Sequence, residues 1–367
     1  MFERLDKIQE RALTGEKISR EDALFLFEPQ TELEAVREIA DSLRRSQHGD
    51  YVYYNVNAHL NPTNICKLRC PLCAFSCDSH EEQAYVLSGE EMLQTAKEAA
   101  LHGATEIHIV GGIHPEKPYA WYRGILEKIH AAVPQLQLKA WTAIEIDHFA
   151  KLCRQTYEEV LHDLISVGLS GLPGGGAEIF DPEIRQKIAP EKGSFEIWRN
   201  VHRAAHSIGL PTNATMLFGH LESPRHRVDH LLTLYDLQQE SLRQNRPARF
   251  EAFVPLVFHP YRTQLAGLKP ISPDEILRTV AVSRILLSNI PHVKAYWVSL
   301  GLEFARMALR FGADDFDGTV RQEKVHHAAG SKTPVGLDAE QIRQCILAVH
   351  RVPVERDSHY QIRSRAT

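Results

Sequence analysis

The sequence predicts an α/β protein, and within that class a (β/α)8 barrel of the triosephosphate isomerase (TIM) type. Eight short apolar runs alternate along the 367 residues with segments that carry helix-start signals. The composition, 43% hydrophobic and 24% charged, is that of a globular chain with a sizeable core. No internal repeat or long polar linker divides the chain, so one barrel accounts for its length. A doubly wound open sheet is the alternative that this alternation allows.

Buried parallel strands form continuous apolar runs, because helices cover both faces of their sheet. Runs of about five to nine residues, rich in β-branched and aromatic side chains, fit this description. In chain order the predicted strands are Val52–Leu60, Glu106–Val110, Gln137–Thr142, Val167–Leu172, Asn213–Phe218, Phe250–Phe258, Val293–Leu300 and Asp315–Val320.

The segments between these runs begin with residues that cap helices. Ser88 and Glu91 form an S-x-x-E capping box, in which each side chain accepts a hydrogen bond from the other residue's backbone amide. At three further positions a capping side chain precedes a proline, which is favoured as the first helical residue. These pairs are Asp181-Pro182, Ser223-Pro224 and Ser272-Pro273; Glu275 completes a second S-x-x-E, and Asp338 opens a predicted last helix, Asp338–His350.

The two ends of the chain are predicted to flank the barrel. Glu32–Leu43 has apolar residues at a helical period, so residues 1–45 are expected to form an N-terminal helical extension. Residues 46–335 form the expected barrel, and residues 336–367 a C-terminal helix and tail packed on it.

Charge and hydrophobicity argue against several classes of function. Against 47 acidic residues stand 42 lysines and arginines, so no basic excess directs the chain to nucleic acid. No apolar run approaches the roughly 18–20 residues that span a bilayer, and the first residues lack the apolar core of a signal peptide. The expected location is the cytoplasm, with neither nucleic acid nor membrane as partner. There, closely spaced cysteines indicate metal or redox chemistry more than disulfides.

The strongest chemical signal is a cysteine cluster directly after the first predicted strand. Cys66, Cys70, Cys73 and Cys77 fall within twelve positions. Three thiolates spaced C-x3-C-x2-C can wrap one loop around an iron–sulfur cluster and leave one iron open for a small molecule. A zinc knuckle is the alternative, although no second ligand pair follows downstream. Cys77 could serve as a fourth ligand, or the ligands could be Cys70, Cys73 and Cys77.

This spacing resembles the hallmark of the radical S-adenosylmethionine (radical SAM) superfamily. The resemblance implies that Cys66, Cys70 and Cys73 bind a 4Fe–4S cluster, and that SAM chelates its fourth iron and is consumed as a co-substrate. Leu72 departs from the aromatic residue usual before the third cysteine, and Cys77 is interpreted as a bystander.

Glycine-rich stretches after two strands are expected to meet SAM. Gly111 and Gly112 resemble the motif that receives the methionyl amino group, because paired glycines allow a backbone to approach a ligand closely. Glu178 follows a second glycine run and could accept ribose hydroxyls or the ammonium of SAM; a helix-start acid is the alternative. Thr215 completes the predicted cofactor-binding residues.

Active sites of these barrels lie at the C-terminal ends of the strands, and further candidates follow from that position. The predicted catalytic residues are His259, Glu145 and His114. A substrate with carboxylates needs cationic or amide partners, so Lys139, Arg262, Arg306 and Asn213 are the predicted substrate-binding residues.

Longer stretches resemble the aminofutalosine synthase family of menaquinone biosynthesis. They include NPTNIC, GGIHP, KAWTAIEI, GLPGGGAEIFDPEIRQKI, FVPLVFHP, GADDFDGTV and VERDSHY. The resemblance implies addition of the 5′-deoxyadenosyl radical to 3-[(1-carboxyvinyl)oxy]benzoate, giving 6-amino-6-deoxyfutalosine, with flavodoxin or ferredoxin as electron donor. The alternatives are dehypoxanthine futalosine cyclase and, from another class, a non-catalytic iron–sulfur or zinc protein.

Overall fold

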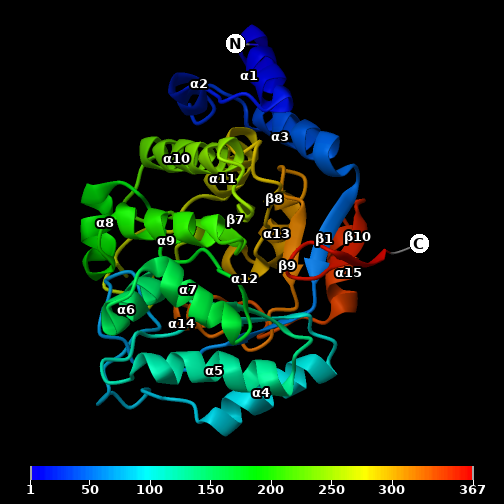
Figure 1. The fold of residues 1–367 in the computed structure, drawn as a ribbon. Helices are drawn as coiled ribbons and strands as arrows, with labels where there is room; N and C mark the ends of the chain where they lie inside the picture. Colours follow the sequence, from blue (N-terminus) through cyan, green and yellow to red (C-terminus); the bar gives the residue numbers. More distant parts are fainter. Residues whose placement is uncertain (1, 366–367) are drawn as a thin grey trace.

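A ring of parallel strands forms the centre of the protein in the computed structural model, which describes residues 2–365 (Figure 1). The first barrel strand is interrupted at Val56, which divides it into β1 (Tyr51–Asn55) and β2 (Asn57–Leu60). The other barrel strands are β3 (Glu106–Ile109), β4 (Gln137–Ala140), β5 (Leu169–Gly171), β6 (Thr212–Phe218), β7 (Phe250–Val257), β8 (His292–Val293) and β9 (Asp315–Gly318).

Hydrogen bonding closes these strands into a barrel. The ladders run in sequence order from β2 to β5 and from β6 to β8, and β9 pairs with β1. Single parallel bridges, Leu172 to Thr212 and Lys294 to Asp315, connect the remaining neighbours. The predicted (β/α)8 barrel is therefore confirmed, and the open-sheet alternative is wrong.

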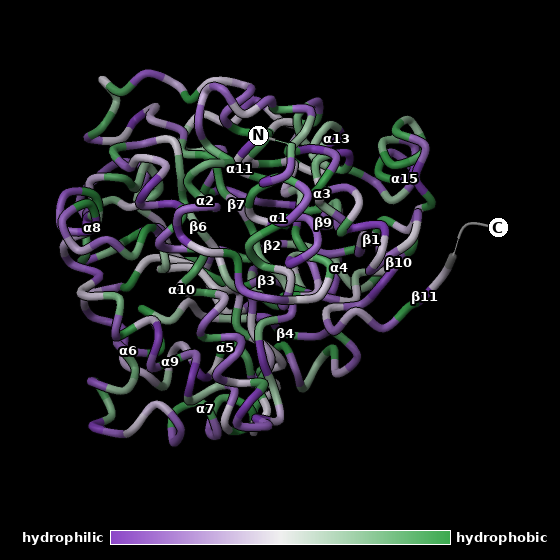
Figure 2. Tube along the Cα trace, turned by 90° about the horizontal axis from the view of Figure 1, so that it is seen from above, coloured by the Kyte–Doolittle hydropathy of each residue, from purple (hydrophilic) through white to green (hydrophobic). Residues whose placement is uncertain are grey.

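Helices surround the ring. Figure 2 shows the strands in the interior and α6, α7 and α8 at the periphery, where hydrophobic and hydrophilic residues alternate along the chain. The helices, with one 3-10 turn (η1), are α1 (Phe2–Thr14), α2 (Arg20–Phe25), α3 (Leu33–His48), α4 (Gly89–Leu101), α5 (Tyr119–Ala132), α6 (Ala143–Cys153), α7 (Tyr157–Ser166), α8 (Pro182–Ile188), η1 (Pro190–Lys192), α9 (Phe195–Ser207), α10 (Pro224–Arg243), α11 (Pro273–Leu286), α12 (Trp297–Leu300), α13 (Leu302–Ala308), α14 (Val325–Ala328) and α15 (Ala339–Leu347).

The C-terminal tail closes the bottom of the barrel. Strand β10 (Val352–Arg356) runs parallel to β1, and β11 (Ile362–Arg365) returns antiparallel to β10. The backbone amide of Ser358 donates to Gln137 at the start of β4, and the Tyr360 ring stacks on His292 at the start of β8. Since these contacts reach strands on different sides of the ring, the tail forms the floor of the lumen. Residues 366 and 367 of the predicted C-terminal part lie outside the described residues.

Two sequence predictions differ from the structure in instructive ways. The predicted strand Val293–Leu300 ends early, and Trp297–Leu300 forms the short helix α12, because a short apolar run does not distinguish a buried strand from a buried helix. Ser272 caps α11 as expected, but the reciprocal bond is missing, since the Glu275 carboxylate pairs with Arg227 at 2.7 Å. The boxes at Ser88 and Asp338 are both present, and the last helix ends at Leu347 instead of His350.

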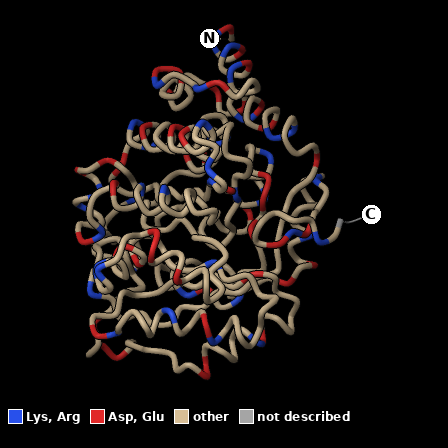
Figure 3. Tube along the Cα trace, in the orientation of Figure 1, with Lys and Arg blue, Asp and Glu red and all other residues tan. Residues whose placement is uncertain are grey.

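Charges of both signs are interspersed over the molecule (Figure 3). No helix within residues 2–365 is long and apolar enough to cross a membrane.

A buried carboxylate at the bottom of the barrel gives a stability prediction. Asp314 accepts hydrogen bonds from Arg284, from His292 Nδ1 at 2.5 Å and from the Val293 amide at 2.8 Å. Burial alone would raise the pKa of Asp314, but His48, His292 and Arg284 together hold it well below its usual value. The carboxylate thus stabilises the fold above the unfolded-state pKa, and this contribution is lost as the pH falls toward the folded-state pKa.

Asp314→Asn should lower the free energy of unfolding at neutral pH by about 3–5 kcal/mol, because Arg284 would stay buried without its counter-charge. Urea unfolding measures the loss. The difference in unfolding free energy between Asp314→Asn and the wild type should narrow below about pH 4, because Asp314 of the unfolded wild type takes up a proton there. A gap that stays constant down to pH 3 would mean that charge is not the source of the effect.

Candidate active site

The cysteine loop, residues 61–77, is folded back on itself by backbone hydrogen bonds. The Cys66 amide donates to the Cys77 carbonyl at 3.1 Å, and the Cys77 amide donates to the Asn64 carbonyl at 3.0 Å. The Cys77 side chain is buried, and its sulfur lies 3.8 Å from the Asn64 carbonyl oxygen. Cys77 therefore supports the loop, and it is not among the residues that line the cavity described next.

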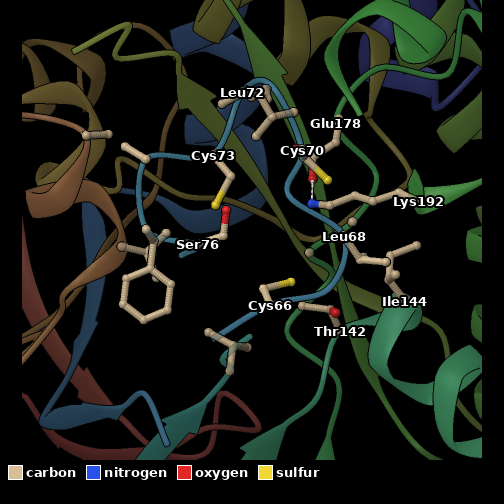
Figure 4. A pocket seen from close by; sticks show the side chains of 18 of the residues that line it. Cys66, Leu68, Cys70, Leu72, Cys73, Ser76, Thr142, Ile144, Glu178 and Lys192 are labelled. Atoms are coloured by element: carbon tan, nitrogen blue, oxygen red, sulfur yellow. Dashed lines mark hydrogen bonds and ion pairs between the residues drawn. The ribbon is translucent and has the colours of Figure 1, made fainter. Parts of the chain in front are cut away.

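Cys66, Cys70 and Cys73 line one cavity of about 250 Å³ at the C-terminal ends of the strands, here called the upper cavity. Figure 4 shows their sulfurs pointing into the same space. Among residues 2–365, the group of potential ligand atoms within 4.8 Å of one another belongs to His48, His292 and Asp314, and the three sulfurs form no such group. One tetrahedral zinc would hold its sulfurs about 3.8 Å apart, given its bond lengths. The donor set fits a larger iron–sulfur cluster better than a single zinc ion.

The loop lies directly against Gly111 and Gly112, which follow β3. The Gly112 amide donates to the Thr63 carbonyl at 2.8 Å, and the Lys67 amide donates to the Ile113 carbonyl at 2.9 Å. A Cβ atom at Gly112 would stand 2.2 Å from the Ile65 carbonyl oxygen, one residue before the first ligand cysteine. Both glycines line the upper cavity, but Gly112 lacks a side chain because the cysteine loop occupies that space.

A buried ion pair lies beside the cysteines. Glu178 and Lys192, from η1, are 2.5 Å apart and both line the upper cavity, as the dashed line in Figure 4 marks. Burial would raise the pKa of Glu178, but the Lys192 ammonium outweighs it and lowers the pKa below its usual value. Burial also raises the pKa of the Cys70 thiol to about 11, against the opposing effect of Lys192. The sequence analysis missed Lys192, because an isolated lysine in a short turn forms no motif.

Three more predicted residues reach the upper cavity. Glu145 forms a capping box with Thr142 at the start of α6 and accepts a hydrogen bond from the Gly111 amide at 3.2 Å. Its burial raises the pKa of the carboxyl group to about 7. Thr215 on β6 donates to the Gly174 carbonyl, and His259 is held by the Ser299 carbonyl at 2.8 Å. All three side chains therefore already have protein partners.

Three predicted residues line neither the upper cavity nor the chamber that lies below it. The His114 ring accepts a hydrogen bond from the Glu116 amide and so stabilises its own turn. Arg262 is exposed and lines an outer groove that also touches Cys70 and Cys73. Arg306 lies on α13, close enough to Cys345 to affect the pKa of that thiol, and lines neither the upper cavity nor the chamber below it.

A second cavity of about 190 Å³, the deep chamber, continues into the lumen below the upper cavity. The two share one wall, formed by Val110, Thr142, Gly175, Thr215, Leu256, Val325 and His326. The predicted residues Lys139 and Asn213 line this chamber and not the upper cavity. Its other polar residues were missed by the sequence analysis; they are His59, Glu106, His108, Lys294, Tyr296, Asp317, Glu323 and His326.

One pattern in the sequence indicates the residues that line the lumen. Polar side chains interrupt strands that are otherwise apolar, as His108 does in Glu106–Ile109 and Lys139 does in Gln137–Ala140. The ladder places His59, His108 and Lys139 at one level on three adjacent strands. A buried polar residue inside a barrel strand is costly unless it has a function or a partner, so such interruptions identify residues of the lumen.

The two cavities thus adjoin, one lined by the three thiols at the mouth of the barrel and the other a polar chamber above its floor. The thiols can hold a metal cluster, and the chamber can hold a polar organic molecule. The shared wall combines the apolar side chains of Val110, Leu256 and Val325 with the polar ones of Thr142, Thr215 and His326, so a species generated at the cluster would meet that molecule inside the barrel.

Comparison with known proteins agrees with this arrangement. Residues 60–234 match the model of the radical SAM superfamily, and residues 248–367 match the model described as the CofH/MqnC C-terminal region. An aminodeoxyfutalosine synthase of Thermus thermophilus is 41% identical over 98% of this chain and 95% of its own length. The enzyme of that name from Streptomyces coelicolor is 40% identical over 97% of this chain and 93% of its own.

A 5-amino-6-(D-ribitylamino)uracil–L-tyrosine 4-hydroxyphenyl transferase of Nostoc punctiforme is 36% identical over 97% of both chains. Among solved structures, methylornithine synthase superimposes with a TM-score of 0.73 at 18% identity, covering 94% of this chain and 97% of its own. An FeFe-hydrogenase maturase from Carboxydothermus hydrogenoformans gives 0.72 at 18% identity, over 98% of this chain and 81% of its own. These structural likenesses support the fold.

The contact between Gly112 and Ile65 gives a prediction about cluster content. Gly112→Val should displace the cysteine loop, so the iron bound after anaerobic reconstitution should fall severalfold. Iron and sulfide analysis measures this. Gly124→Ala is the matched control, since a Cβ atom there meets nothing within 4 Å and the residue lies in α5. Full iron content in Gly112→Val, with only weaker SAM binding, would show that the glycine faces the ligand instead.

Proposed function

Because the chain belongs to the radical SAM superfamily, in the group that joins a radical SAM domain to a CofH/MqnC C-terminal region, we propose that it acts as an aminodeoxyfutalosine synthase. It would join the adenosyl group of SAM to 3-[(1-carboxyvinyl)oxy]benzoate and form 6-amino-6-deoxyfutalosine for menaquinone biosynthesis. The observation that carries the proposal is that the cavity of the C-x3-C-x2-C loop and the deep chamber adjoin, with seven lining residues in common.

Cys66, Cys70 and Cys73 would hold the 4Fe–4S cluster, for which their separated sulfurs are suited. When bound, the cluster and SAM supply a 5′-deoxyadenosyl radical. The proposed SAM-binding residues are Gly111, Gly112, Glu178 and Thr215, all of which line the upper cavity. Lys192 joins them, because its ammonium offsets the negative charge of Glu178 and of nearby thiolates.

The chain's own contribution is to keep the reacting groups together and dry. Val110, Leu256 and Val325 present apolar side chains where the two cavities meet. A primary carbon radical reacts with the first suitable partner, so an acceptor held directly beside the place where the radical forms would be that partner. Glu145 and His259 remain proposed catalytic residues by position; Glu145 also braces the Gly111 turn.

The atoms and electrons of the proposed reaction balance without a further reactant. The bond between the sulfur and C5′ of SAM breaks, and C5′ bonds to the terminal CH2 carbon of the vinyl group. The aryl group breaks its bond to the ether oxygen and bonds to the neighbouring carbon, where that oxygen remains as the ketone oxygen. The carboxyl group on that carbon leaves as carbon dioxide. SAM and the acceptor thus give the adduct, methionine and carbon dioxide, and the electron that initiates the reaction is returned at its end. Flavodoxin or ferredoxin as its donor, and a cytoplasmic location, belong to the same proposal.

The first prediction from this function concerns the ligands. Cys66→Ala, Cys70→Ala and Cys73→Ala should each abolish SAM cleavage under dithionite, because each removes one of three thiolates. Cys77→Ala should keep its iron and its activity, since Cys77 does not face the cavity. Loss of the cluster in Cys77→Ala with retention in Cys66→Ala would assign the ligands to Cys70, Cys73 and Cys77.

The second prediction separates addition from hydrogen abstraction. If the radical adds, the labelled adenosyl skeleton of SAM ends in the product, and free 5′-deoxyadenosine is a minor leak. A dehypoxanthine futalosine cyclase would instead release 5′-deoxyadenosine in step with product. Mass spectrometry of reactions with ¹³C-adenosyl SAM gives the ratio of 5′-deoxyadenosine to product directly. A ratio near one with unlabelled product would overturn the assignment.

A further inference from the structure

The deep chamber contains polar atoms that the fold itself does not satisfy. Asn213 Oδ1 is buried and has no hydrogen-bond partner within the described chain, and buried Glu106 Oε2 has only a long ion pair, with Lys139 Nζ at 3.5 Å. The rings of His59 and His108 stack on each other at 4.5 Å, and no hydrogen bond from either ring exists among residues 2–365. Buried polar groups without partners are costly, so the chamber is built to receive a polar ligand.

Two buried lysines lie in this chamber with only loose contacts. Lys139 Nζ is 3.5 Å from Glu106 and 3.3 Å from the Ser358 carbonyl oxygen, and Lys294 Nζ is 3.4 Å from Asp317. The Glu178–Lys192 pair of the upper cavity is closed at 2.5 Å. Each ammonium carries three N–H donors, so both lysines keep donors free for a ligand in the chamber.

Both lysines act on the same carboxylate. Lys139 and Lys294 each lower the pKa of Glu106, and both lysines line the deep chamber with it, so both ammonium groups lie near that carboxylate. Arg356, which also acts on Glu106, is committed to Asp315 at 2.6 Å below. The floor therefore offers a carboxylate ligand two cations at once.

His326 is the polar side chain of the shared wall that remains uncommitted. Thr215 donates to the Gly174 carbonyl, and Thr142 belongs to the capping box of α6. Neither ring nitrogen of His326 has a hydrogen-bond partner within residues 2–365, and burial lowers the pKa of the ring to about 4. At neutral pH the His326 ring is thus neutral, and one of its two nitrogens carries an N–H that can donate to a ligand where the two cavities meet.

The acceptor of the proposed reaction has one carboxylate on its aromatic ring and one on the vinyl carbon that is bonded to the ether oxygen. The vinyl group has to meet C5′ of SAM, so it belongs at the shared wall. The ring carboxylate, at the other end of the molecule, then extends to the floor.

We propose that the deep chamber orients the acceptor by treating its two carboxylates differently. Lys139 and Lys294 bind the ring carboxylate, which the product keeps, and His326 donates to the vinyl carboxylate, which is lost. An ammonium would hold a carboxylate more tightly than a neutral imidazole does, so the weaker partner stands at the group that leaves. This inference rests on the function proposed above.

The experiment compares the acceptor with 2-phenoxyacrylate, which lacks only the ring carboxylate. Kd values are measured by equilibrium dialysis with reconstituted enzyme and no reductant, so that nothing reacts. The wild type should bind the full acceptor roughly 10- to 100-fold more tightly than the analogue. Lys294→Met should lose most of this preference and bind the analogue as the wild type does. Lys139→Met should behave in the same way, and exposed Lys97→Met should change neither Kd.

Equal weakening of both ligands in Lys294→Met, or no weakening, would overturn the assignment of the lysines. Because that variant leaves Asp317 unpaired, the double variant Lys294→Met/Asp317→Asn provides the same comparison without an isolated charge. Failure of the proposed function is a separate result: the reduced wild type would form no adduct, whatever the Kd values.

The role of His326 is tested by the ratio of 5′-deoxyadenosine to adduct and not by the affinity for the acceptor. His326→Leu should keep the preference for the ring carboxylate and raise the ratio of 5′-deoxyadenosine to adduct severalfold, since a misplaced vinyl group is attacked less often. His326→Gln, which keeps an N–H donor, should restore a ratio close to that of the wild type. An unchanged ratio in His326→Leu, or loss of the ring-carboxylate preference, would remove His326 from the proposed position.

Discussion

The close contact of Gly112 with the backbone of Ile65 fixes the position of the cysteine loop and of its three thiols. It joins the end of β3 to the cysteine loop at a point where even a methyl group would not fit. The backbone bonds on either side, from Gly112 to Thr63 and from Lys67 to Ile113, hold the loop in the same register. The position of three thiols over the lumen therefore follows from backbone packing, and the cavities below them have a fixed origin.

Below the cysteine loop, the buried ion pairs of the barrel are of two kinds. The pairs Glu178–Lys192 and Arg356–Asp315 are short, at 2.5 and 2.6 Å, as expected of groups that shape a buried site. Lys139 and Lys294 keep longer contacts and leave donors free toward the chamber. A buried ion pair with an unfilled hydrogen-bonding capacity is a poor source of stability. Its persistence in the lumen is better explained by a ligand that completes it.

The sequence was sufficient where the information is local. Capping residues such as Ser88 act within one turn of helix, and the cysteine spacing lies within one loop, so both could be predicted. The helix at Trp297–Leu300 could not, because an apolar run fits a strand equally well. Lys294 and His326 come from distant segments and meet only when the barrel closes. Arg306 shows the converse: a suitable charge was predicted for the lumen but lies on an outer helix.

The floor of the lumen has a consequence for how the protein is made. The ribosome synthesises the cysteine loop, residues 61–77, long before residues 352–360, which form the floor. Until the tail has been synthesised, the lumen lacks the residues that form its floor. Any cluster inserted at that stage would sit above an unsealed lumen. Docking of the tail thus completes the lower end of the chamber, and because translation begins at the N-terminus, this end forms only after all the other strands of the barrel have been synthesised.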